Sequence, residues 1–94
     1  MANFSYYNIE TKKPAAGRGI VVTGEIHNET SKDYHTAVFK LVIFSGQESI
    51  ASSVVKVQGF RSRGTKTFEV LIEELDFGLV NRITKCDLMF ESVY

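Results

Sequence analysis

Two histidines are the residues of this chain best suited to metal chemistry. His27 and His35 lie on either side of a short polar segment, and the carboxylates of Glu25 and Asp33 are close to them in sequence. Imidazole and carboxylate groups are the ligands that zinc and similar ions take from proteins. Their spacing matches no metal-binding motif, so we expect two solvated histidines at strand ends and no metal or other cofactor.

Nucleophilic and acid–base chemistry has weaker support. Cys86 is the only cysteine, which excludes an intramolecular disulfide. It falls on the apolar side of an alternating segment, and the neighbouring Lys85 falls on the other side, where it cannot lower the thiol's pKa. Glu73, Glu74 and Asp76 cluster at an expected strand end, where no cleft would hold a substrate between two carboxylates. We therefore expect no catalytic residues and no enzymatic activity.

A basic loop offers a different chemistry. Arg61, Arg63 and Lys66 lie close together around a glycine, and guanidinium groups and loop amides are suited to binding phosphate. Phe60 beside them is suited to stacking on a base. The chain contains 11 basic and 11 acidic residues, so no general positive field attracts nucleic acid, which we do not expect as a partner. Binding of an anionic ligand or nucleic acid at this loop is the alternative function.

Alternating apolar and polar residues indicate the elements that position these groups. A period of two runs through residues 19–28, 65–73 and 85–91, and it predicts half-buried antiparallel strands. In the first segment, the side chains expected to face the core are those of Ile20, Val22 and Ile26, with Gly24 between them.

Two further segments predict strands less cleanly. Residues 4–10 have an ambiguous facing. In residues 49–58, Ile50 and Val54 fall out of phase with the apolar residues that follow, and a β-bulge near Ser52-Ser53 would restore the phase.

The whole pattern predicts an all-β protein. About six or seven short strands, separated by glycine-containing and polar turns, are typical of an immunoglobulin-like antiparallel β-sandwich. The length of 94 residues suits one domain, so we expect residues 1–94 to form a single domain. The apolar share of 44% is that of an ordinary globular protein.

Three ordered segments resemble the FxLYD domain, a small immunoglobulin-like sandwich of bacterial and archaeal proteins. They are Gly24-Glu25-Ile26-His27-Asn28, Leu41-Val42-Ile43-Phe44-Ser45-Gly46 and Gly64-Thr65-Lys66-Thr67-Phe68. In the second segment, Leu41 replaces the family's Phe, Phe44 its Tyr and Ser45 its Asp. The resemblance implies the fold and a role among cell-envelope or accessory modules, and it transfers no catalytic residue.

The segment 34–44 is apolar on both sides. Opposite the expected core residues it carries Val38, Val42 and Phe44, interrupted only by Lys40. Apolar surface left in water costs about 25 cal/mol per Å². Either another segment, such as residues 77–80, covers this side, or it is a surface for contact with a partner or with another copy of the chain.

We therefore expect a non-catalytic, immunoglobulin-like interaction or accessory module. It would act through protein–protein contact, with an unknown protein or by self-association, at Val38, Val42 and Phe44. The N-terminus has no signal-peptide pattern, and no run approaches the roughly 18 apolar residues of a membrane span. The sequence as given suits the cytoplasm, or a domain excised from a cell-envelope protein.

Overall fold

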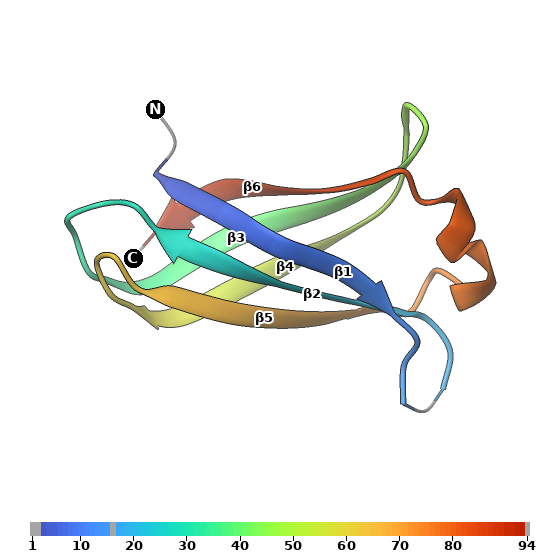
Figure 1. The fold of residues 1–94 in the computed structure, drawn as a ribbon, viewed down its shortest axis with the longest axis horizontal. Coiled ribbons are helices and arrows are strands. Elements are labelled where there is room, and N and C mark those ends of the chain that lie inside the picture. The colour runs from blue at the N-terminus through green and yellow to red at the C-terminus, as the bar shows by residue number, and fades with distance from the viewer. Residues whose placement is uncertain (1–2, 16, 94) are drawn as a thin grey trace.

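The computed structural model describes residues 3–15 and 17–93. These residues form six strands and one short 3₁₀ helix (Figure 1). The elements are β1 (Phe4–Lys12), β2 (Ile20–Asn28), β3 (Tyr34–Ser45), β4 (Glu48–Phe60), β5 (Thr65–Ile72), η1 (Phe77–Arg82) and β6 (Lys85–Val93).

The strands form two three-stranded antiparallel sheets. One has the order β1-β2-β5 and the other β4-β3-β6, and Figure 1 shows the first lying across the second. The core lies between the sheets, and its largest fully buried side chains include Ile20 and Ile26 from one sheet and Phe39, Leu41 and Phe60 from the other. The all-β prediction is confirmed.

The central strands β2 and β3 supply nearly half of the buried core. Every second residue of β2 is buried, as the alternation predicts. On β3 the inward side chains from Ala37 to Ile43 have no exposed surface, and the outward Val38 and Val42 are also buried. Because β4 and β6 flank β3 on both edges, their side chains shield its outer side as well.

The bulge in β4 lies nearer the N-terminus than predicted. The register with β3 shifts between Ile43 and Phe44, which leaves Ile50 as the extra residue instead of the Ser52-Ser53 pair. This shift lets Ile50 pack against the core. Val54 is not brought inward, and it stays on the outer face opposite Lys40.

The segment around η1 covers one end of the molecule. Asp76 begins the helix, and its carboxylate accepts a hydrogen bond of 3.2 Å from the amide of Gly78. Leu75 is buried, Phe77 packs against the core, and Figure 1 places η1 beyond the ends of the strands. Residues 77–80 therefore do not cover the outer side of β3. Among the described residues, no helix is long and apolar enough to cross a membrane.

Candidate interaction surfaces

Asn28, the last residue of β2, joins two loops at the end opposite η1. Its side chain is fully buried, and its amide donates to the carbonyl oxygens of Lys32 (2.9 Å) and Arg61 (3.1 Å). Its carbonyl oxygen accepts from the backbone amide of Thr30 (2.9 Å) and from the hydroxyl of the same residue (2.6 Å). All the hydrogen-bonding capacity of this buried amide is therefore used within the protein.

Further bonds hold the two loops together. The amide of Ser62 donates to the carboxylate of Asp33 (2.7 Å), and its hydroxyl donates to the carbonyl of Thr30 (2.7 Å). The Asn28-Glu29-Thr30 triplet has the form of a glycosylation acceptor. Because the acceptor amide is buried and doubly bonded, the folded chain cannot be glycosylated there.

The structure brings together two of the three cations of the basic loop. Arg61 and Lys66 line a hollow of about 240 Å³, with Gly59, Phe60, Gly64 and Thr65 as its other residues. Arg63 is exposed but does not line this hollow.

Two features that would strengthen anion binding at this loop are not available. The amides of residues 62, 63 and 64 already donate to Asp33, Asn28 and Arg61, so these three are not free to bind an anion. Phe60 is fully buried, so its ring cannot stack on a base.

The two histidines have separate partners in different sheets. His27 bonds the hydroxyl of Thr65 (2.8 Å) through one ring nitrogen and lies 3.2 Å from the carboxylate of Glu29 through the other. His35 bonds the hydroxyl of the neighbouring Thr36 (3.0 Å). No three His, Cys, Asp or Glu residues of the described chain are placed to hold a metal ion together.

Cys86 is half-buried beside the core. Burial raises the pKa of its thiol, and the neighbouring carboxylate of Asp87 raises it further. Both effects disfavour the thiolate, which is the reactive form. The thiol is therefore less nucleophilic than that of a solvated cysteine.

The outer face of the sheet β4-β3-β6 holds the predicted contact residues, but their neighbours are more exposed. Val38 and Val42 expose only 9% and 6% of their surface, and Phe44 is half-buried with the Lys85 ammonium 5.4 Å from its ring centre. Val54 and Met89 are 55% and 47% exposed.

These exposed residues form one line across the sheet. The register places Val54 of β4 and Met89 of β6 on either side of Lys40, and we name these three residues the Lys40 row. The sequence places Val54 out of phase with Val55 and Val57, and the structure keeps it so, with Val55 and Val57 buried and Val54 on the outer face.

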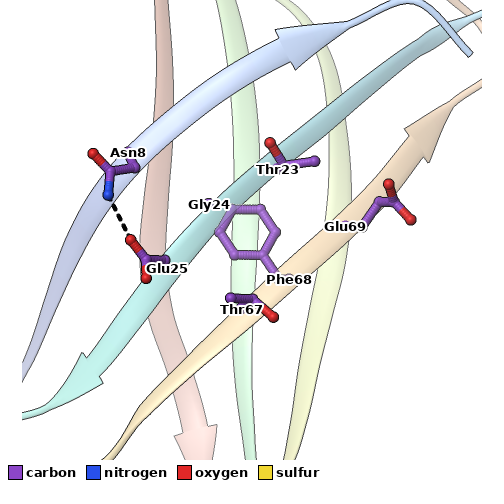
Figure 2. A pocket seen from close by; sticks show the side chains of 7 residues that line it. All are labelled: Asn8, Thr23, Gly24, Glu25, Thr67, Phe68 and Glu69. Atoms are coloured by element: carbon purple, nitrogen blue, oxygen red, sulfur yellow. Dashed lines mark hydrogen bonds between the residues drawn. The ribbon is translucent and has the colours of Figure 1, made fainter.

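A second surface feature lies on the outer face of the sheet β1-β2-β5. It is a hollow of about 530 Å³ lined by Asn8, Thr23, Gly24, Glu25, Thr67, Phe68 and Glu69 (Figure 2), and we name it the Gly24 hollow. β1 bulges here, with two residues opposite Gly24, and Asn8 has a positive φ of 53°.

Gly24 lets an aromatic ring pack against β2 from the core side of the sheet, beneath this hollow. A Cβ atom at this position would lie 2.6 Å from a ring carbon of Phe68, so only glycine allows this close approach. Asn8 donates a hydrogen bond to the carboxylate of Glu25 at the rim. Sequence reasoning did not identify this hollow, although a glycine at a core position of β2 was a signal for it.

Comparison of the chain with known protein families, with curated proteins and with solved structures finds no match in any of the three. The function must therefore be argued from the surfaces themselves.

Proposed function

We propose that this chain is an immunoglobulin-like sandwich related to the FxLYD domain, and that it is a non-catalytic interaction or accessory module. It would act through protein–protein contact at the outer face of the sheet β4-β3-β6. The strand order supports the fold assignment. Sheets β1-β2-β5 and β4-β3-β6 correspond to strands A-B-E and C′-C-F of the immunoglobulin fold.

The residues that carry the family resemblance also contact one another. Gly24 packs against the ring of Phe68, and the backbone amide of Asn28 donates to the carbonyl oxygen of Gly64 (2.9 Å). The first and third resembling segments thus specify one packing arrangement. The contact between these two segments supports a relationship to the FxLYD domain more strongly than isolated matches do, because the matched residues depend on each other.

The Lys40 row is the observation that carries the proposed function. Val54 and Met89 are large apolar side chains that remain about half exposed, and they lie side by side with Val38 and Val42 on one sheet face. Contiguous apolar surface with a polar surround is typical of protein contact sites. No described segment of the chain packs over this face, since the η1 segment lies at the end of the strands.

Site-specific photo-cross-linking tests this proposal. A photoreactive amino acid at position 89 should give a discrete protein adduct in cells that naturally express the chain. The same amino acid at position 79, an exposed leucine in η1 away from this face, is the matched control. No adduct at position 89, or the same adduct at both positions, would contradict the proposal.

A second candidate function rests on the hollow that Arg61 and Lys66 share. Two cations beside a concave surface are suited to a small anion or to a nucleic-acid phosphate. Titrations with inorganic phosphate and with a single-stranded oligonucleotide test it, at low and high salt. Binding at low salt that Arg61→Ala weakens would support this function, and no binding at low salt would exclude it.

A further inference from the structure

The outer face of β4-β3-β6 carries uncompensated positive charge. The register places Lys40, Lys56 and Lys85 on this face together with Asp87. Lys85 and Asp87 pair with each other at 3.0 Å, which leaves two lysines. Glu91 lies in the bulge of β6 and has no partner in the register.

The outer face of β1-β2-β5 carries the opposite charge. Glu10, Glu25 and Glu69 lie on it by register, against the single cation of Lys12. Among the described residues, the only ion pairs are His27–Glu29 and Lys85–Asp87. The glutamates of one face and the free lysines of the other therefore have no salt-bridge partner among residues 3–15 and 17–93.

The Gly24 hollow gives the acidic face a shape as well as a charge. Figure 2 shows Glu25 and Glu69 on either side of the Phe68 ring, with Thr23 and Thr67 at the other corners. A lysine side chain has a long apolar stem and a charged end. The Phe68 ring is buried on the core side of the sheet, so the part of the hollow that suits a lysine is its rim, where two carboxylates can meet the ammonium.

We infer that the occupant of the Lys40 row is a second copy of this chain, which presents its acidic β1-β2-β5 face, with Lys40 entering the Gly24 hollow of that copy. This inference rests on the proposed function, because it names the partner of the same face. Val54 and Met89 would lie on the apolar residues of the acidic face, among them the exposed Tyr7 and Leu71.

The dimensions of the molecule allow such a contact. The molecule measures 41 × 29 × 20 Å, and Figure 1 looks down the shortest axis onto the β1-β2-β5 sheet. The two longer dimensions bound a face of about 1,200 Å², whereas a standard interface buries about 800 Å² on each partner. The faces point in opposite directions, so the contact is head-to-tail and extends to an open stack or a ring.

Charge also selects this pairing over the symmetric one. Two β4-β3-β6 faces placed together would oppose Lys40 and Lys56 to their own copies, and like charges in an interface are strongly unfavourable. The whole chain has a formal net charge of zero, so no overall repulsion keeps copies apart.

Charge exchange between the two faces tests the inference. We expect wild-type protein to sediment faster as its concentration rises at low salt, and added salt to reverse this. Lys40→Glu alone and Glu69→Lys alone should each weaken association by about tenfold or more, because each opposes like charges. An equimolar mixture of the two variants should restore association, since each face then meets its opposite.

Three results would overturn this inference: a wild-type monomer at every concentration, undiminished association of Lys40→Glu, or no recovery in the mixture. Both positions are exposed, so thermal melts of the variants should match wild type and exclude misfolding. The cross-linking experiment separates this inference from the proposed function. An adduct at position 89 with a different protein retains the function and excludes the second copy, whereas no adduct contradicts both.

Discussion

The end of the molecule at Asn28 and the outer face at the Lys40 row use their polar groups in opposite ways. Around Asn28, buried amide, hydroxyl and carbonyl groups bond one another, and no buried side-chain polar atom of the described residues lacks a partner. On the outer face, Lys40 has no ion-pair partner and its apolar neighbours are half exposed. Asn28, which belongs to a motif-like segment of the sequence, has its polar groups bonded within the fold. The exposed outer face, by contrast, consists of residues that match no sequence motif.

The largest expected effect is on the Asn28 end. Asn28→Asp replaces two donors with a carboxylate that faces the carbonyl oxygens of Lys32 and Arg61. We expect a loss of about 3–5 kcal/mol in the free energy of unfolding, because a buried charge is left without a partner. Urea denaturation measures it, with His35→Ala as a control near zero. A change below about 1 kcal/mol would show that the two loops do not depend on this residue.

A smaller loss is expected where Gly24 packs against Phe68 on the core side of the sheet. Gly24→Ala places a Cβ atom 2.6 Å from a ring carbon of Phe68, and such overpacking costs about 1–3 kcal/mol. Gly78→Ala is the control, because the nearest atom to its added Cβ lies 3.8 Å away. In a double-mutant cycle, Phe68→Leu should remove part of the cost of Gly24→Ala. Strict additivity of the two changes would contradict the predicted contact.

Alkaline pH should lower the stability that the half-buried Tyr6 and Cys86 contribute, and it should leave the hydrogen bonds of Asn28 unchanged. Burial raises the pKa values of the Tyr6 hydroxyl and the Cys86 thiol, so the folded state holds both protons more tightly than the unfolded state. Their contribution to stability is complete below the unfolded pKa of each group and is lost as pH rises through the folded one.

The resulting decline should begin above about pH 8.5 for the cysteine and about pH 10 for the tyrosine. It should stay below about 1 kcal/mol, because both groups keep partial access to solvent. Thermal melts between neutral pH and pH 11 measure it, and Cys86→Ala should remove the earlier part. A stability that rises with pH over this interval would contradict the assignment.

The strand pattern could be predicted from the sequence because alternation depends only on neighbouring residues. It correctly placed Ile20, Val22 and Ile26 in the core. The bulge could not be located, because its position depends on the pairing of β4 with β3 and decides which way the residues between 50 and 53 face.

Other features of the surfaces depend on strand order. Which residues flank Lys40 is known only when β4 and β6 are placed on either side of β3. The burial of Val38 and Val42 follows from the same arrangement. The sequence also contains the residues of the Gly24 hollow in three distant segments, and only the sheet brings Glu25 and Glu69 together.

The most direct test of the proposed contact surface measures both the free energy of unfolding and the cross-linking yield of one variant. A photoreactive amino acid at position 54 reports contact at the Lys40 row, and Met89→Asp places a charge at the other end of that row. We predict that Met89→Asp changes the free energy of unfolding by no more than about 0.5 kcal/mol, because residue 89 is half exposed, yet lowers the adduct yield by about tenfold or more. Leu79→Asp, at the end of the molecule, should leave the yield unchanged. An equal yield in Met89→Asp and wild type would contradict the claim that this face is the contact surface.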